Sequence, residues 1–196
     1  RRKACSAFSR RPIRRVLKGY PTKLYKAGLP DAKGVYVLTP VLAQSGNWTG
    51  VAFVNGKKIP FAFPVKAAAE VPTIGSPAPR SASPTKSNPL GVDPICTRDP
   101  ACPLHTTSLS DLVGTGRPVA VMFATPALCQ FARCGPVLDQ LLAIRKPYED
   151  RIAFVHVEIY KSNKGVDVSP TVKAWNLPGQ PWMFTVNGQG IVTGRV

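Results

Sequence analysis

Long apolar runs are missing from this sequence. No stretch of about 18 uncharged apolar residues occurs, so we expect no membrane-spanning helix. The chain begins with Arg1 rather than Met and has no N-terminal apolar segment, so we interpret it as a chain that has lost a signal peptide, or as a fragment. A hydrophobic share of 44% over 196 residues suffices for one full domain and a smaller piece.

Acidic residues are scarce, and their scarcity is uneven. The chain has 26 Lys and Arg but only 10 Asp and Glu, which gives a net charge of +16. The segment 1–26 contains ten of the basic residues and none of the acidic ones. We predict that it is a disordered basic tail that can contact an anionic surface. Because no nucleic-acid recognition motif accompanies the charge, no specific nucleic-acid partner is predicted.

Residues 27–70 have the composition of β-strands. Strands are predicted at 34–42, 51–54 and 59–65, with a turn at 45–50. Between the last two strands, Asn55-Gly56 is a strong hairpin signal. The order resembles the last three strands of small immunoglobulin-like sandwiches in bacterial envelope proteins. Three strands are too few to close a sandwich, so we predict a small, partial β-rich segment.

Residues 71–94 contain six prolines and four serines. This composition is typical of an extended linker that is stiffened by polyproline II segments. We therefore predict a domain boundary here, with the second domain starting at residue 95.

From residue 95 on, predicted strands alternate with predicted helices. Strands are predicted at 118–123, 152–159, 182–186 and 191–193, and helices at 109–113, 136–144 and 171–175. Such alternation favours a mostly parallel sheet with helices on both faces. The pattern therefore predicts an α/β domain over residues 95–196.

Cys129 and Cys134 lie between a predicted strand and a predicted helix, where thiol–disulfide chemistry is usually found. Their spacing is Cys-x4-Cys rather than Cys-x2-Cys. Residues i and i+5 of a regular helix are roughly 8–9 Å apart at their Cα atoms, whereas a disulfide needs about 4.4–6.8 Å. The pair can therefore bridge only if residues 126–133 are not a regular helix. Gly135-Pro136 would then open the helix.

The chain from residue 95 on resembles the thioredoxin-like superfamily, nearest to its envelope thiol–disulfide and peroxiredoxin-like branch. The family's first signature is Phe-Trp-Ala-x-Trp-Cys-Gly-Pro-Cys followed by Pro-x-Leu-Asp, and Phe123 and Pro136-Val-Leu-Asp139 match its two ends without a gap. The second signature, a cis-proline before a strand, fits Pro181-Trp-Met-Phe184-Thr-Val186. The cysteines depart from the pattern, because the family's two Cys positions are occupied by Leu128 and Phe131.

This resemblance implies an α/β fold, a thioredoxin-like α/β/α sandwich preceded by the small β-rich N-terminal segment. It also implies that Pro181 shapes the substrate-binding edge beside a thiol site. The family's last helix is missing from residues 95–196. In the family pattern Cys129 falls one residue late and Cys134 three residues late, so the family's nucleophile role does not transfer to either by position alone.

Other candidate residues lie away from this pair. For Cys96 and Cys102 we expect a local disulfide. One alternative is zinc bound by both, His105 and one further ligand, although the spacing matches no common zinc finger, and another is a cross-link to the Cys129/Cys134 pair. For His156 we expect a core histidine with a hydrogen-bond partner; the alternative is a copper ligand alongside the Cys129/Cys134 pair. Glu158 is expected to be a surface charge, or otherwise a buried carboxylate that serves proton transfer.

We predict a thiol–disulfide oxidoreductase of the bacterial cell envelope, extracytoplasmic, with Cys129, Cys134 and Pro181 at its site. Cys129 is expected to attack first and Cys134 to resolve, although the inverse assignment stays open. Its partners would be protein thiols or disulfides, and neither a cofactor nor a metal is predicted. One alternative is a non-catalytic envelope binding module with structural disulfides, and another is a copper chaperone; whether the chain is an enzyme stays open.

Overall fold

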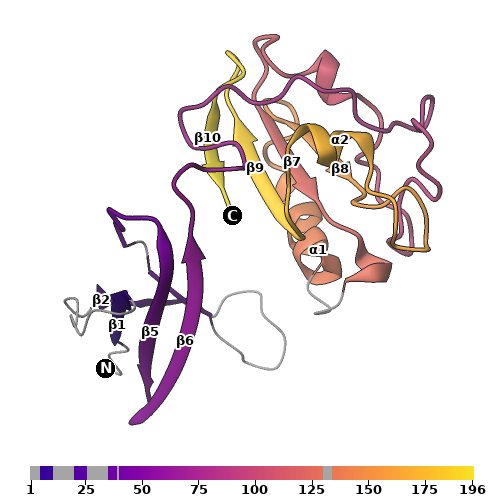
Figure 1. Ribbon diagram of the computed structural model, residues 1–196. Coiled ribbons are helices and arrows are strands. Elements are labelled where there is room, and N and C mark those ends of the chain that lie inside the picture. The colour runs from indigo at the N-terminus through magenta and orange to yellow at the C-terminus, as the bar shows by residue number, and fades with distance from the viewer. Residues whose placement is uncertain (1–4, 11–19, 26–34, 39, 130–133) are drawn as a thin grey trace. The chain divides into compact units, whose positions relative to one another are not determined.

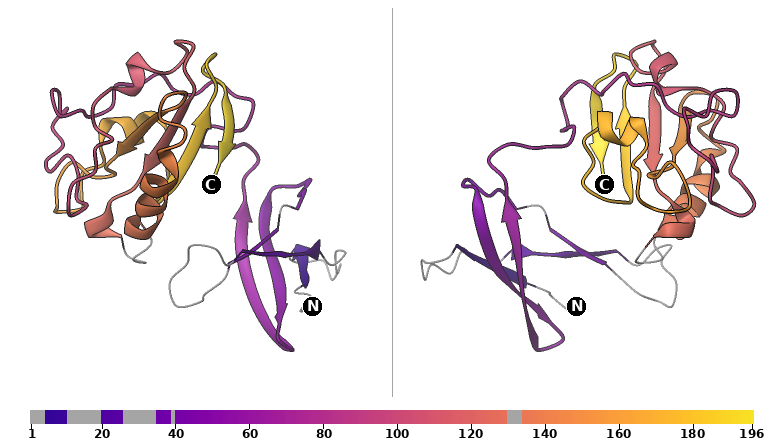
Figure 2. Two further views of the ribbon diagram at one scale, coloured as in Figure 1. Left: turned by 180° about the vertical axis from the view of Figure 1, so that it is seen from behind. Right: turned by 45° about the vertical axis from the view of Figure 1, so that its right-hand side comes forward.

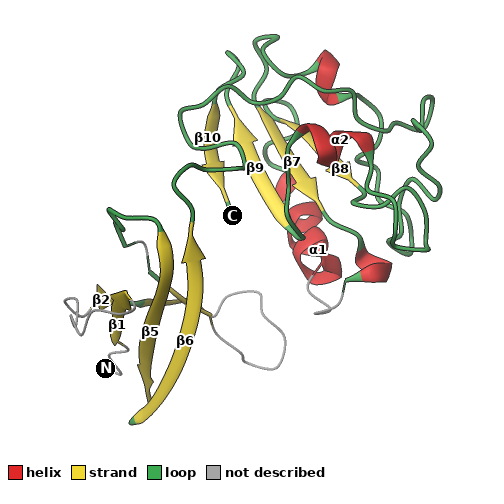
Figure 3. Cartoon of the chain, in the orientation of Figure 1, coloured by secondary structure: helices red, strands yellow, loops and turns green. Residues whose placement is uncertain are grey.

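The described part of the structure, a computed structural model, comprises residues 5–10, 20–25, 35–38, 40–129 and 134–196. The chain divides into two compact units, Arg1–Ala69 and Glu70–Val196 (Figure 1). The described part of the first unit contains strands and loops, and the second combines a sheet with helices (Figure 3).

The first unit contains an antiparallel sheet with the strand order β2-β1-β5-β6 and a separate pair of strands, β3 and β4. The strands are β1 (Cys5–Arg10), β2 (Tyr20–Pro21), β3 (Lys23–Tyr25), β4 (Val35–Val37), β5 (Gly46–Val54) and β6 (Lys57–Val65).

Part of the predicted disordered tail is a strand. β1 pairs with β5 over six positions, from Cys5 opposite Phe53 to Arg10 opposite Trp48. Ladder hydrogen bonds come from the backbone, so a basic composition does not prevent a segment from adding to a free strand edge. β2 and β3 also lie within residues 1–26, and residues 1–4, 11–19 and 26 lie outside the described residues.

The hairpin between β5 and β6 forms at the predicted turn. Asn55 and Gly56 are its two loop residues, and both have positive φ angles, 51° and 78°, as a type I′ turn requires. The predicted turn at 45–50 lies mostly inside β5 instead. Gly50 has no Cβ, and the ring of its cross-strand partner Phe61 occupies the space that a Cβ would take. This glycine therefore serves close packing rather than a turn.

The second unit is built on a four-stranded sheet with the order β10-β9-β7-β8. Its strands are β7 (Val119–Phe123), β8 (Ala153–Val157), β9 (Trp182–Val186) and β10 (Val192–Arg195). β7 and β8 are parallel, whereas β9 is antiparallel to both β7 and β10. The predicted strands are thus found, but the sheet is mixed rather than mostly parallel. The connection between β9 and β10 is too short for the crossover that a parallel pair needs.

Helices cover both faces of this sheet (Figures 1 and 2). On one face, α1 (Cys134–Arg145) packs its Leu138 against Met122 of β7. On the other face, α2 (Pro170–Ala174) and the following Trp175 join the cluster around Phe123. Neighbouring residues of a strand point to opposite faces, so β7 contributes to both layers. The predicted α/β/α sandwich is confirmed. The remaining helices are single 3₁₀ turns, Leu109–Asp111 and Pro126–Leu128.

Among the described residues, no helix has the length and apolarity needed to cross a membrane. The longest, α1, has 12 residues.

An aromatic group forms the centre of the core under α2. The ring of Trp175 is fully buried, and its centroid lies 5.1 Å from that of Phe123 and 5.0 Å from that of Phe184. Both pairs are tilted, a geometry that adds to the free energy gained from burying the rings. These residues attach α2 firmly to the central strands β7 and β9.

The predicted linker belongs to the second unit, which begins at Glu70. Ser83 is buried; its Oγ accepts a hydrogen bond from the Leu109 N–H at 2.9 Å, and its own N–H donates to the Ser108 Oγ at 2.8 Å. Prolines keep the segment 71–94 out of strands and helices, but they do not prevent its small side chains from packing into the domain. The composition therefore describes the local conformation and not the domain boundary.

Candidate functional site

Cys129 and Cys134 do not share a regular helix. Cys129 directly follows the 3₁₀ turn Pro126–Leu128 and has extended backbone angles, φ −82° and ψ 109°. Cys134 is the first residue of α1. Residues 130–133 between them lie outside the described part of the chain. Cys129 thus stands outside the helix, which is the condition under which a Cys-x4-Cys pair can bridge.

The two cysteines interact across the start of α1. The backbone N–H of Cys134 donates a hydrogen bond to the Cys129 Sγ at 3.3 Å. Cys134 is fully buried, whereas Cys129 is partly exposed. Burial, together with a hydrogen bond to the Cys129 sulfur, raises the pKa of Cys134 to about 12. The buried thiol therefore keeps its proton at neutral pH, and Cys129 is the more exposed of the two sulfurs.

The side chain of Gln180, just before Pro181, hydrogen-bonds to residues close to the two cysteines. Its Oε1 accepts hydrogen bonds from the Thr125 N–H at 2.9 Å and from the Cys134 Sγ at 3.5 Å. Its Nε2 donates to the Leu128 carbonyl at 3.3 Å. The peptide bond between Gln180 and Pro181 is cis, and β9 follows directly. Sequence reasoning selected Pro181 and missed Gln180, which no motif distinguishes from other polar loop residues.

The position of this proline completes a recognisable arrangement. A central strand, β7, is followed by the segment that carries Cys129 and then by α1. A parallel strand, β8, lies beside β7, and a cis-proline opens the antiparallel hairpin β9–β10 on the other side. The second unit has a thioredoxin-like fold. A match by fold does not by itself establish an activity.

Comparisons with known proteins add little to this assignment. Neither a protein-family model nor a curated protein sequence matches the chain. Among solved structures, the chain is similar to a crystal structure described as a thiol:disulfide interchange protein, DsbE, from Chlorobium tepidum. The two share 17% sequence identity with a TM-score of 0.44, over 63% of this chain and 84% of the other. The thioredoxin-like fold therefore rests on the strand order and the two helix layers of this chain.

A buried carboxylate lies close to Cys129, to which it is linked through Thr97 and Ala127. Glu158 is 2% exposed, and its Oε1 accepts hydrogen bonds from the Thr97 N–H at 2.6 Å and the Thr97 Oγ1 at 3.0 Å. Its Oε2 has no hydrogen-bond partner among the described residues. Burial raises the pKa of Glu158, and its charge contributes to the raised pKa of Cys134. The expectation of a surface charge was wrong. Glu158 directly follows β8, on the same side of the chain as His156, and Thr97 covers it.

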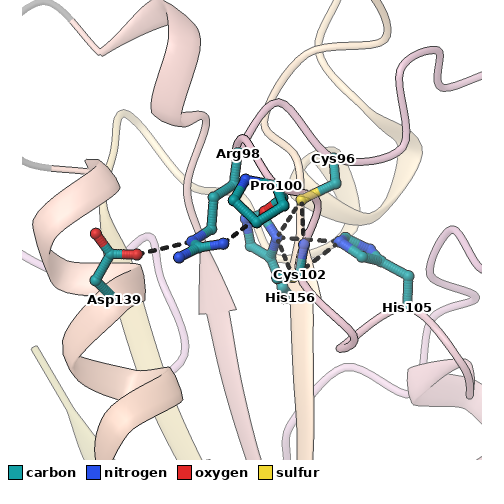
Figure 4. A network of polar contacts seen from close by, with 7 residues as sticks. All are labelled: Cys96, Arg98, Pro100, Cys102, His105, Asp139 and His156. Atoms are coloured by element: carbon teal, nitrogen blue, oxygen red, sulfur yellow. Dashed lines mark hydrogen bonds and ion pairs between the residues drawn. The ribbon is translucent and has the colours of Figure 1, made fainter.

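A second group of potential ligands lies in the loop before the first 3₁₀ turn and on β8. Cys96, Cys102, His105 and His156 are all buried, and one ligand atom from each lies within 4.8 Å of all the others (Figure 4). Both cysteines are free thiols, so the expected local disulfide between Cys96 and Cys102 is not formed. The sequence suggested His105 as a partner of these two cysteines but did not connect His156 to them. The expectation that His156 is a core histidine with a hydrogen-bond partner is confirmed, because it is fully buried and contacts the Ala124 carbonyl.

The contacts within this cluster are short. The Cys102 Sγ lies 3.3 Å from the His105 Nε2 and 3.4 Å from the His156 Nδ1. The His156 Nδ1 lies 3.8 Å from the Cys96 Sγ and 3.1 Å from the His105 Nε2. The hydrogen bond between the two cysteines lowers the pKa of Cys96 and raises that of Cys102.

The fold brings these four residues together along one edge of the sheet. β8 is an edge strand, and the loop before the first 3₁₀ turn runs beside it, with the His156 N–H donating to the Leu104 carbonyl at 3.1 Å. Further along, the Asp93 N–H donates to the Lys161 carbonyl at 2.7 Å. The loop thus covers an edge that would otherwise expose unpaired backbone groups. His156 pairs with Met122 of β7, so both side chains lie on the α1 face of the sheet. His156 therefore points to the same side as the loop residues Cys96 and Cys102, which belong to the cluster under α1.

Proposed function

We propose that this protein is a thiol–disulfide oxidoreductase in which Cys129 attacks and Cys134 resolves. The observation that carries the proposal is the hydrogen bond from the Cys134 N–H to the Cys129 Sγ at the start of α1. A backbone N–H that donates to a sulfur stabilises the thiolate, and the helix N-terminus adds positive potential there. The difference in exposure supports this order of roles, because the attacking sulfur must be reached by a second protein.

The proposed reaction is an exchange of disulfides. The Cys129 thiolate attacks one sulfur of a substrate disulfide, which forms a mixed disulfide and releases the other substrate sulfur as a thiolate that takes up a proton. The Cys134 sulfur then loses its proton and attacks the Cys129 sulfur. This step forms the Cys129–Cys134 disulfide and releases the second substrate thiol. The substrate gains two electrons and two protons, and the protein dithiol loses them; the reverse sequence oxidises a substrate dithiol.

Gln180 and Pro181, which precede β9, also support this assignment. The Gln180 Oε1 accepts a hydrogen bond from the Cys134 S–H, so Gln180 can hold the thiol of the proposed resolving cysteine in place. Pro181 and Trp182 line an apolar groove between β9 and α1. We propose that Pro181 positions the substrate polypeptide next to Cys129, as the resemblance implies.

We further propose that the exchange takes place outside the cytoplasm, in the bacterial cell envelope, on protein thiols or disulfides. Two close cysteine pairs in a chain of this size support such a location or a redox role. The basic composition of residues 1–26 supports contact with an anionic surface of the envelope.

The test is the reduction of insulin disulfides by the full chain with dithiothreitol as the electron source. We expect Cys129→Ser to abolish turnover, and Cys134→Ser to accumulate a mixed disulfide that is visible by mass spectrometry without reductant. Cys5→Ser, which changes the cysteine of the other unit, is the control and should retain full activity. If Cys129→Ser and Cys134→Ser both fold and neither changes the rate nor traps a substrate, the non-catalytic binding module is the better account.

A further inference from the structure

We propose that Cys96, Cys102, His105 and His156 bind one Zn²⁺ ion in a closed, tetrahedral Cys₂His₂ site. This site is separate from the Cys129/Cys134 pair and does not depend on the proposed function. Four donor atoms converge from two parts of the chain, with each atom within 4.8 Å of the other three (Figure 4). The Nδ1 of His156 and the Nε2 of His105 both face the space that the two sulfurs also face.

Four of the six distances between the donor atoms are close to the edges of a zinc tetrahedron, and the other two lie within 4.8 Å. With Zn–S bonds of about 2.3 Å and Zn–N bonds of about 2.05 Å, the edges would be about 3.4 Å for N···N, about 3.6 Å for N···S and about 3.8 Å for S···S. The contact between the two imidazole nitrogens is 3.1 Å, and the three N···S contacts of 3.3, 3.4 and 3.8 Å average close to the expected edge. Small side-chain shifts would therefore suffice to centre an ion.

The chemistry of the donors favours zinc over the hard divalent cations. Two sulfurs and two imidazole nitrogens in tetrahedral array suit Zn²⁺, whereas the oxygen ligands that Ca²⁺ and Mg²⁺ need are not in the set. Two thiolates and one Zn²⁺ ion with neutral imidazoles make an electrically neutral unit. Such a unit can be buried at far lower cost than a lone thiolate. With four protein ligands the site is closed, so its role is structural rather than catalytic.

Neighbouring groups orient two of the ligands. The His156 Nε2 lies 3.0 Å from the Ala124 carbonyl, to which its N–H donates, so the Nδ1 lone pair is free to face a metal. The Cys102 N–H donates to the Cys96 Sγ at 3.3 Å and stabilises its thiolate form. The His105 Nδ1 is buried without a hydrogen-bond partner among the described residues, so this ring is held by packing and by its place in the cluster.

Zinc at this position would fasten the covering loop to β8. The residue after Cys96 is Thr97, whose Oγ1 and N–H donate to the buried Glu158. The same Thr97 Oγ1 accepts a hydrogen bond from the Ala127 N–H at 3.2 Å, two residues before Cys129. The site would therefore stabilise both the sheet edge and the loop that carries the first cysteine.

The test measures metal in the full chain, purified with a phosphine reductant, loaded with ZnCl₂ and passed through a desalting column. We expect about one zinc per chain by plasma mass spectrometry, and loss of at least nine-tenths of it in Cys102→Ser and in His156→Gln. The double variant Cys129→Ser/Cys134→Ser is the control and should keep its zinc. A wild-type content below about 0.1 per chain, or zinc that is lost only in the control, would overturn the proposal.

A second measurement covers the case in which the ligand variants do not fold. Zinc-loaded wild-type protein is treated with 5,5′-dithiobis(2-nitrobenzoic acid) before and after addition of a chelator. We expect Cys96 and Cys102 to be unmodified before chelation and both to be modified afterwards, as mapped by peptide mass spectrometry. Substitution by Co²⁺ should give the intense visible bands of tetrahedral thiolate coordination. Equal modification with and without chelator, or a Cys96–Cys102 disulfide in the purified chain, would contradict the zinc site.

Discussion

The buried thiol of Cys134 should make the second unit less stable in alkaline solution. Its pKa lies at about 12 in the folded protein, above the ordinary value of a thiol near 9, because of burial first and the Cys129 contact second. A raised folded-state pKa gives stability that is fully present below about pH 9 and is lost as the pH rises toward 12. A difference of about three pH units corresponds to about 4 kcal/mol, of which about 2.5 kcal/mol is lost by pH 11.

The assay compares urea unfolding of the reduced wild-type chain and Cys134→Ala at pH 8 and pH 11, followed by tryptophan fluorescence, to which the buried Trp175 of the second unit contributes. Other groups titrate in both proteins, so only the difference in unfolding free energy matters, and the wild type's advantage should shrink by about 2.5 kcal/mol. Leu138→Ala, at an equally buried position of α1, is the control; its cost of about 2–5 kcal/mol should not change with pH. An advantage of Cys134 that is the same at both pH values would refute the reasoning.

Two further predictions concern the packing of the second unit. Gly188→Ala should lower the free energy of unfolding by about 1–3 kcal/mol, because its new Cβ would meet the backbone carbonyl of Gly116, whereas Gly179→Ala, which faces open space, should change it by less than about 0.5 kcal/mol; similar costs would count against the contact. Ser83→Ala should cost about 1–3 kcal/mol, because it leaves the buried Leu109 N–H unpaired, and a neutral result in urea unfolding would support the linker interpretation.

The sheet and the helix pattern of the second unit could be predicted because their signals are local. The apolar run before Phe123 became β7, the amphipathic stretch after Pro136 became most of α1, and Pro181 precedes β9 in a cis peptide as expected. The direction of the strands was harder to predict. Alternation of strands and helices favours parallel pairing, but the hairpin after β9 reverses the chain within a few residues.

The metal cluster could not be assembled from spacing, because its fourth ligand comes from another part of the fold. Cys96, Cys102 and His105 lie in one irregular loop, and His156 lies on a strand far along the chain. Only the register of β8 beside that loop, seen in the hydrogen bond from the His156 N–H to Leu104, brings them together. The sequence held one usable signal, because Cys96, Cys102 and His105 lie close together along the chain.

The two cysteine pairs of the second unit share one apolar cluster, yet their surroundings favour different chemistry. Cys134, Cys96 and Cys102 all belong to the cluster under α1, with Cys129 packed against it. Disulfide exchange needs a sulfur that another protein can reach, and Cys129 alone among the four is partly exposed. A closed metal site needs the opposite, namely buried sulfurs that face further ligands, and Cys102 has an imidazole nitrogen within 3.4 Å on two sides. If both proposals hold, exchange at the first pair would leave the second unoxidised, because a bound metal would protect its two buried sulfurs from attack.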